Sequence, residues 1–222
     1  MFKKLITSAI SQSFRDFEIV VTDHTEDDRV KRLLADLPLR IKYVRNTRDF
    51  GNSSANMNLG MFLAEGELIH IMHCDDWYCS NEALALLVEE MDRLPSVHWG
   101  AFAFDHWDEE TERVFNPISP SPDRTLGCPS TTFFRRHCIQ TVNFDESLIY
   151  INDHDFHQSL LLSFGPPIII RQTCVRIGMS ADNLAKKLSE DRLVTETEYF
   201  ELKVALKLEN LQRSHRRAQW AA

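Results

Sequence analysis

Segments with helical spacing alternate with short β-branched segments along the first hundred residues, and this alternation restricts the fold more than any other feature. Helical spacing occurs at residues 2–13, 27–37, 54–64 and 81–94, and strand-like runs at 17–21, 41–44, 67–72 and 99–106. Such alternation favours a mixed or parallel sheet with helices on both faces.

The remaining chain extends this pattern and ends in helices. Residues 153–164 have helical spacing, residues 168–172 form a strand-like run, and the proline-rich segment 116–122 (NPISPSP) predicts a loop. The residues from Ala181 to about Arg217 predict one or two amphipathic helices. We therefore expect one α/β domain over residues 1–180, followed by a helical extension over 181–222.

Charge and cysteine usage narrow the class of protein. The 222 residues carry a formal charge of −8, which argues against nucleic acid as a partner. The five cysteines form no C-x-x-C pair, which indicates reduced thiols. The sequence shows neither a signal-peptide pattern nor an apolar run of about 20 residues, so we expect a cytoplasmic protein with at most peripheral contact at the inner face of a membrane.

Carboxylates follow two of the expected strands. Asp75 and Asp76, within IMHCDDWYCS, come after the run 67–72, and Asp23 comes after the strand 17–21. In open α/β sheets, ligands bind beyond the carboxyl ends of the strands, where three carboxylates would repel one another without a counter-ion. A divalent cation such as Mg²⁺ or Mn²⁺ would offset this repulsion. The alternative is that Asp75 and Asp76 are solvated residues that cap the helix near Asn81.

Ordered motifs give the chain a family resemblance over roughly residues 5–180. The first, SAISQSFRDFEIVVTDHTEDD, spans residues 8–28. Further motifs lie at Gly51 with 56–58 (NMN), at 64–67 (AEGE), at 73–77 (HCDDW) and, more weakly, between 129 and 156. In this order they resemble the family 2 glycosyltransferases. The resemblance implies the GT-A fold, a three-layer α/β/α sandwich with a mixed, mostly parallel sheet.

The resemblance also assigns roles to residues. It places Asp23 on the nucleotide base, Asn56 and Asn58 beside the nucleotide sugar, Asp75 near the ribose or the metal, Asp76 on the metal, and Asp153 as the catalytic base. These roles imply transfer of a sugar, with inversion, from a nucleotide diphosphate donor such as a UDP- or dTDP-sugar. The hydroxyl acceptor would belong to a glycan or a lipid-linked glycan.

Each role has a simpler alternative. Asp153 could cap a helix and Asp155 could be the base instead, while Asp23 could only initiate a turn. Asn56 and Asn58 could cap a helix or face solvent. His73 could support the metal or be an ordinary hydrogen-bonding neighbour, and Trp77 could stack on a ligand or pack in the core.

Three departures from the family pattern favour a further alternative. The family opens with an apolar strand and a P-[TS]-[YF]-N turn, whereas this sequence starts at the following helix. A truncated product, a mis-assigned start or a fold completed in another way would each account for this. Gly178 stands where many relatives carry a metal-ligating histidine, and Met57 replaces a frequent Arg or Trp. A catalytically inactive module that binds a glycan or a protein is therefore the alternative. A nucleotidyltransferase would need a glycine-rich phosphate loop, which the sequence lacks.

Overall fold

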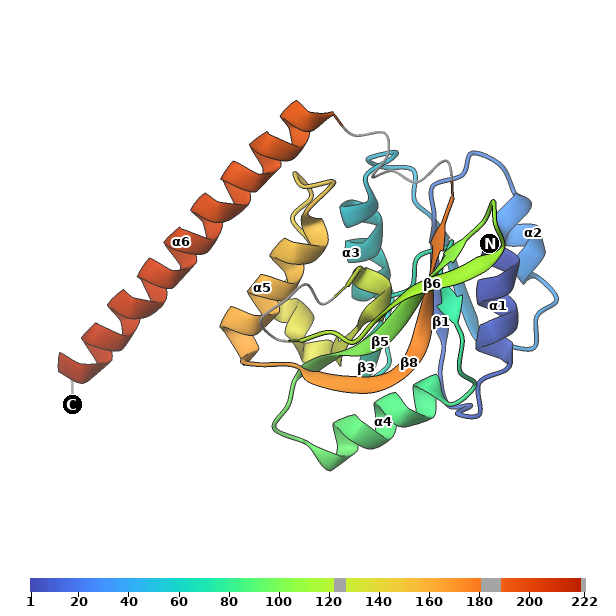
Figure 1. Cartoon of the computed structure of the whole chain (residues 1–222), viewed down its shortest axis with the longest axis horizontal. Helices are drawn as coiled ribbons and strands as arrows, with labels where there is room; N and C mark the ends of the chain where they lie inside the picture. The colour runs from blue at the N-terminus through green and yellow to red at the C-terminus, as the bar shows by residue number, and fades with distance from the viewer. Residues whose placement is uncertain (122–126, 181–188, 221–222) are drawn as a thin grey trace.

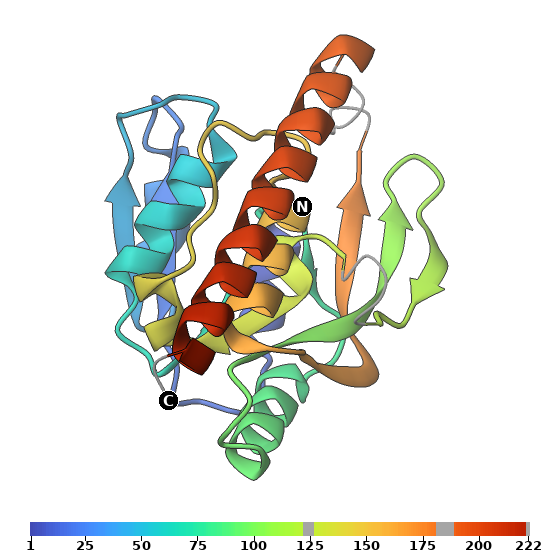
Figure 2. The same ribbon diagram turned by 90° about the vertical axis from the view of Figure 1, so that its left-hand side faces the viewer.

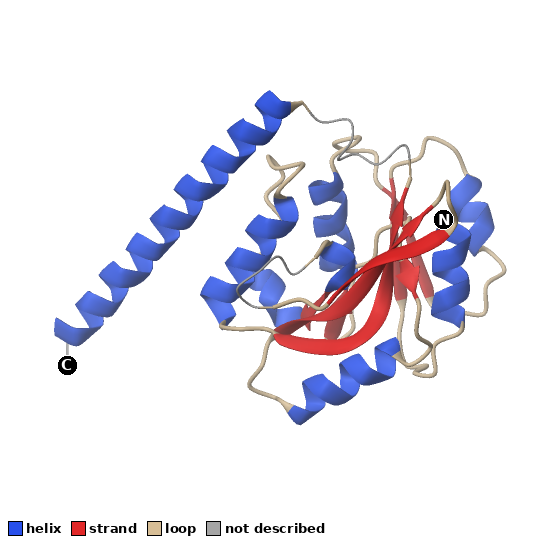
Figure 3. Ribbon diagram, in the orientation of Figure 1, coloured by secondary structure: helices blue, strands red, loops and turns tan. Residues whose placement is uncertain are grey.

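The computed structural model describes residues 1–121, 127–180 and 189–220 of an α/β protein (Figures 1 and 3). The helices are α1 (Phe2–Ile10), α2 (Arg29–Leu34), α3 (Ser53–Leu63), α4 (Ala83–Arg93), α5 (Asn152–Phe164) and α6 (Glu190–Trp220), with short 3-10 turns at Pro129–Thr131 and Arg136–Gln140. The strands are β1 (Ile19–Asp23), β2 (Ile41–Arg45), β3 (Leu68–His70), β4 (Trp77–Tyr78), β5 (Trp99–Asp108), β6 (Arg113–Ile118), β7 (Thr132–Arg135) and β8 (Ile168–Met179).

The strands form two separate sheets. β1 and β2 pair in parallel as a two-stranded sheet, while the other six follow the order β3-β7-β5-β8-β4, with β6 paired to β5. Among the described strands of the larger sheet only β5 and β8 are parallel, and the remaining pairs are antiparallel. The mixed sheet is thus confirmed, but the expected predominance of parallel pairs is not found among the described strands.

Helices cover both faces of the larger sheet, as the alternation predicts. On one face Met61 of α3 and Phe156 of α5 pack in one core with the sheet residues Trp99 and Phe134. On the other face α4 packs against Phe102, Phe133 and their neighbours. Along β5, alternate residues enter the two cores because successive side chains of a strand point to opposite faces. The three-layer arrangement is visible in Figure 1, where α4 lies on the opposite side of the sheet from α3 and α5.

One loop expected from the sequence is partly a strand. β6 includes Asn116 and Pro117, which lie in the segment predicted to be a loop. The pairing of β5 with β6 is irregular between Phe104 and His106, and Asn116 has a positive φ of 49°. A proline is tolerated here because β6 is an edge strand with a local bulge, so no ladder hydrogen bond from Pro117 is required.

A cleft separates the two sheets. Within the described residues β1 pairs only with β2, and β3 only with β7, and residues of β1 and β3 line a common cleft of about 1860 Å³ together with α1 and α3. Four of the five residues of β1 are half-buried, although parallel strands are normally covered on both faces. Among the described strands none joins β1 to β3.

The last described helix lies outside the three layers. α6 runs along the outer side of α5 and extends past the body of the protein (Figures 1 and 2). The sequence predicts one or two helices from Ala181, and α6 covers Glu190–Trp220 of that segment, whereas residues 181–188 lie outside the described part. None of the described helices combines enough length with enough apolar residues to cross a bilayer.

His157 gives the core a testable pH dependence. The side chain is 6% exposed, its Nε2 lies 2.6 Å from Thr132 Oγ1, and its ring stacks on Trp99. Burial, and to a lesser degree the positive charge of His154, lowers the pKa of His157 from 6.5 to about 3. Above pH 6.5 both the folded and unfolded states hold a neutral imidazole. Below it only the unfolded state gains a proton, so stability falls as the pH falls toward 3.

We therefore expect the stability of the wild type to decline, relative to His157→Gln, by about 2 kcal/mol between pH 7 and pH 5. Urea unfolding of both proteins at each pH measures this difference. A difference that stays constant between the two pH values would show that His157 is not held neutral in the folded state.

Candidate functional site

The candidate site lies in the cleft between β1 and β3. Asp23, at the end of β1, lines the cleft together with Asp75 and Asp76, which follow β3. Asp153, in the first turn of α5, also lines it. Residues from three separate parts of the chain therefore meet in one cleft, two of them beyond the carboxyl ends of strands, where ligands bind in open α/β sheets.

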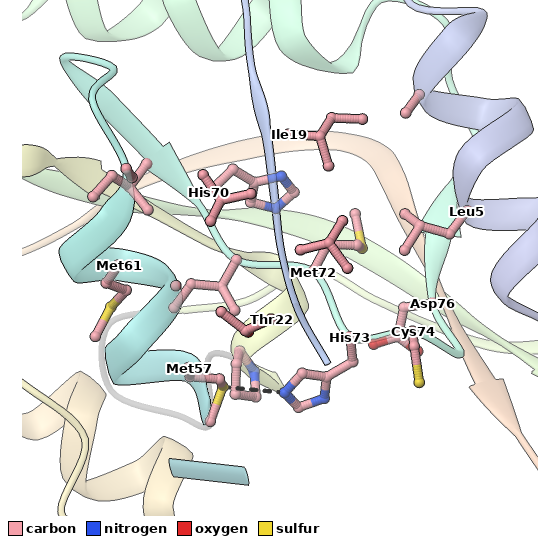
Figure 4. Close-up of a pocket in the computed structure, with 18 of the residues that line it drawn as sticks. Leu5, Ile19, Thr22, Met57, Met61, His70, Met72, His73, Cys74 and Asp76 are labelled. Carbon is pink, nitrogen blue, oxygen red and sulfur yellow. Dashed lines mark hydrogen bonds between the residues drawn. The ribbon is translucent and has the colours of Figure 1, made fainter. Parts of the chain in front are cut away.

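Three side chains after β3 form a cluster suited to a cation. Ligand atoms of His73, Asp75 and Asp76 lie within 4.8 Å of one another. Two carboxylates and an imidazole are a donor set that suits Mn²⁺, and the carboxylates alone suit Mg²⁺. The residues present thus fit a divalent metal. His73 points from this cluster toward α3, where its Nε2 lies 3.2 Å from Met57 Sδ (Figure 4).

Asp76 is the most buried member of the cluster. It is 2% exposed, its Oδ1 accepts a hydrogen bond from the Gly178 N–H at 2.9 Å, and the Cys128 thiol lies 3.7 Å from its Oδ2. Burial raises the pKa of Asp76 to about 6, although His73 lowers it. A carboxylate held in such a place is costly for the protein alone and is stabilised when a cation binds.

The capping alternative for the acidic pair is wrong. The residue that precedes α4 is Glu82, whose side chain makes no capping hydrogen bond, and the Leu84 N–H of the first turn donates to Gln12 Oε1 at 3.1 Å. The backbone N–H of Asp76 instead bonds to the His73 carbonyl at 3.2 Å, so the pair lies on a tight turn.

Gly178 serves the site through its backbone. A Cβ at this position would lie 2.2 Å from the carbonyl oxygen of Asp75 and 2.5 Å from Met1 Sδ. No side chain fits there without movement of the backbone, so a histidine like that of the relatives has no room in this structure. The close approach lets the Gly178 N–H reach Asp76.

We expect Gly178→Ala to lower the free energy of unfolding by about 1–3 kcal/mol, since overpacking against backbone atoms is not readily relieved. Gly60→Ala is the matched control. Its Cβ would meet Thr22 only at 3.6 Å, and alanine is the better helix former, so this variant should be neutral or slightly stabilised. Urea unfolding compares the two. Equal stabilities of Gly178→Ala and wild type would contradict the close approach.

The polar atoms of Asp23 are used within the protein. Its two oxygens accept hydrogen bonds from the N–H and hydroxyl of Thr25, at 2.8 and 2.9 Å, and from Tyr43 Oη at 2.8 Å. The turn that was the simpler alternative therefore exists, on a residue that also lines the cleft. The role of Asp23 in base recognition stays a prediction.

Asn56 and Asn58 lie on different sides of α3. Asn56 lines the cleft and donates to the Thr22 carbonyl at 3.0 Å, which joins α3 to β1. The amide of Asn58 exchanges hydrogen bonds with the backbone of Phe144 and donates to Glu146 Oε1. Asn58 is not among the described residues that line the cleft, so it supports α3 from behind.

The structure distinguishes between Asp153 and Asp155. Asp153 lies inside the first turn of α5, whose capping residue is Ile151, and it faces the cleft. Burial raises its pKa. Asp155 is 2% exposed and its Oδ2 pairs with Lys203 Nζ at 2.8 Å, so it faces α6. Of the two, only Asp153 is open to a ligand in the cleft.

Sequence reasoning did not single out two further residues of the site. Cys128, whose thiol lies near Asp76, was not among the candidates, and Ser130, whose hydroxyl accepts from the His73 N–H, lies in the weaker motif between 129 and 156. Trp77 is 8% exposed and its ring lies 4.7 Å from Lys4 Nζ, which supports the core alternative for this residue.

Comparisons with known proteins agree with this geometry. The model of the family described as "Glycosyl transferase family 2" matches residues 1–146. A curated relative from Campylobacter jejuni, named GalNAc(5)-diNAcBac-PP-undecaprenol beta-1,3-glucosyltransferase, is 32% identical over 93 residues, which are 40% of this chain and 30% of that protein. This chain thus spans less than a third of the length of that relative.

Solved structures share the fold. Crystal structures of S. aureus TarS match with 16% identity and a TM-score of 0.75 in complex with UDP-GlcNAc, covering 94% of this chain and 63% of that one. The UDP complex matches with 17% identity and a TM-score of 0.66, covering 81% and 56%. At such low identity the likeness concerns the fold, and it supports the GT-A-like architecture. Because the family model covers well over half of the chain, this protein belongs to the family 2 glycosyltransferases.

Proposed function

We propose that this chain transfers a sugar, with inversion, from a nucleotide diphosphate donor to a hydroxyl group of a glycan or lipid-linked glycan. The observation that carries the proposal is the meeting of Asp23, the His73–Asp75–Asp76 cluster and Asp153 in one cleft. The transferase unit would be residues 1–180, with 181–222 as a helical extension.

Asp75 and Asp76, with His73 beside them, would hold a divalent metal. When bound, the metal would offset the charge that develops on the departing nucleoside diphosphate. Asp76 is anchored for this role by the Gly178 N–H at its Oδ1, and its Oδ2, beside the Cys128 thiol, would ligate the metal. Asp23 and Asn56 would contact the nucleotide from the β1 side of the cleft.

Asp153 would act on the acceptor. A carboxylate within hydrogen-bond reach of the acceptor hydroxyl takes its proton as the oxygen attacks the anomeric carbon from the face opposite the leaving group. Attack from that face inverts the configuration. The raised pKa of Asp153, caused by burial, makes this carboxylate a stronger base than an exposed aspartate.

The donor and the acceptor are proposed by likeness. TarS has been crystallised with UDP and with UDP-GlcNAc, and the name of the C. jejuni relative describes an undecaprenol-linked acceptor. A UDP-sugar and a lipid-linked glycan are therefore the first donor and acceptor to examine. A lipid-linked acceptor would bring the protein to the cytoplasmic face of a membrane.

Calorimetric titration of UDP, with dTDP and GDP alongside, in the presence and absence of Mn²⁺ tests the proposal. We expect binding to at least one nucleotide that strengthens with Mn²⁺. If a folded protein binds none of them, the active transferase is excluded. The inactive binding module would then be favoured, since the gap between β1 and β3 and the lack of a side chain at position 178 both weaken the nucleotide site.

A further inference from the structure

α6 contacts the body of the protein through a polar stripe. The stripe consists of Arg192, Glu196, Tyr199, Lys203 and Lys207, which lie three or four residues apart and hence on one helical face. Lys203 Nζ lies 2.6 Å from Asp145 Oδ2, and Lys207 Nζ lies 2.6 Å from Ser159 Oγ. The helix is thus fixed by directional contacts along the segment 145–159.

Glu196 is the buried centre of this stripe. The residue is 3% exposed, and its carboxylate accepts hydrogen bonds from three consecutive backbone N–H groups: those of Ile149 at 3.1 Å, Tyr150 at 2.8 Å and Ile151 at 3.3 Å. Arg192 Nε completes the set at 2.7 Å from Oε1. Burial alone raises the pKa of Glu196, but Arg192 and these N–H groups outweigh it, so the pKa lies below its usual range.

The anchored segment leads directly into the candidate site. Ile151 is the capping residue of α5, and Asp153 follows it in the first helical turn. Ile149, Tyr150 and Asp153 all line the cleft. A carboxylate at this end of α5 also interacts favourably with the helix dipole. Both Glu196 and Asp153 lie beyond the part of the chain that the family model matches.

We propose that Glu196 is a positioning residue, which fixes the backbone of residues 149–151 from α6 and thereby holds Asp153 in place on the acceptor side of the cleft. The proposal rests on the proposed function for its kinetic consequence. Misplacement of a reacting group by about 1 Å costs up to about 100-fold in rate. We therefore expect Glu196→Ala to lower kcat by about 10- to 100-fold and to leave the donor KM and the affinity for UDP with Mn²⁺ within about twofold.

The experiment compares Glu196→Ala and Glu196→Gln with Glu201→Ala, a control at an exposed position of the same helix. Hydrogen exchange of the amides of residues 149–151 measures the anchor directly. UDP titration with Mn²⁺ measures the donor site, and the release of UDP from UDP-GlcNAc and UDP-glucose measures turnover. Glutamine retains a carbonyl acceptor, so its effects should be smaller than those of alanine.

We expect faster exchange at 149–151 and lower kcat in Glu196→Ala, an intermediate result in Glu196→Gln, and neither effect in Glu201→Ala. If Glu196→Ala does not fold, the glutamine variant decides by the same comparison. Unchanged exchange, or faster exchange with unchanged kcat, would overturn the proposal. A wild type that binds no nucleotide would refute the proposed function instead, while faster exchange in the variants would still establish the anchor.

Discussion

Replacement of Asp153 by asparagine is expected to lower kcat for sugar transfer by about 10²- to 10⁴-fold, the usual contribution of a general base. Asparagine keeps the size of the side chain and removes its ability to take a proton. Asp153 lies on the cleft wall, apart from the cluster after β3, so UDP affinity with Mn²⁺ should stay within about twofold. Steady-state kinetics and calorimetry measure the two quantities separately.

The control for this experiment is Asp155→Asn. Asp155 pairs with Lys203 away from the cleft, so its loss should lower the free energy of unfolding and leave kcat within a few-fold. The acid limb of the kcat profile gives a second check. The pKa of this limb should lie above that of an exposed aspartate, because burial raises the pKa of Asp153. The limb should disappear in Asp153→Asn. The reverse pattern, with kcat lost in Asp155→Asn only, would make Asp155 the base.

Replacement of Asp76 by asparagine is expected to abolish the Mn²⁺-dependent part of UDP binding. The loss should exceed about 100-fold, since removal of a residue that only supports a metal ligand already costs 10- to 100-fold. Asparagine retains an oxygen for the Gly178 N–H, so the fold should be preserved. Removal of a buried charge beside Asp75 should leave the unfolding free energy of the metal-free protein equal or higher.

Calorimetry with and without Mn²⁺, together with urea unfolding of the metal-free protein, measures both effects. Asp36→Asn, at an exposed position in the turn that follows α2, is the control and should alter neither quantity. Undiminished Mn²⁺-dependent binding in Asp76→Asn would remove Asp76 from the metal site and leave Asp75 and His73 as the remaining ligands to examine.

Local sequence patterns predicted those parts of the site that are determined by residues close together in the sequence. The ends of the strands at Asp23 and at Asp75 followed from apolar runs and their terminating polar residues. The helix that carries Asp153 was predicted from the helical spacing of residues 153–164. Each of these features is set within about ten residues, where hydrophobic periodicity is informative.

Contacts between distant residues escaped this kind of reasoning. Gly178 and Asp76 are 102 positions apart, and the hydrogen bond between them depends on how β8 passes the turn after β3. The ion pair between Asp155 and the distant Lys203 is what distinguishes Asp155 from Asp153 as a candidate base. The anchor from Glu196 to Tyr150 spans 46 positions and involves backbone groups, which leave no pattern in a sequence.

The division into two sheets also bears on how the molecule unfolds. The unit of β1 and β2 is joined to the rest through α3, by hydrogen bonds such as that from Asn56 to Thr22, and the described strands provide no ladder across the gap. Such a unit can open at lower free energy than the six-stranded sheet, as a separate cooperative step. A nucleotide that contacts both Asp23 and the acidic pair would join the two steps, so that occupancy of the site, as well as the sequence, would determine whether the protein unfolds as one body.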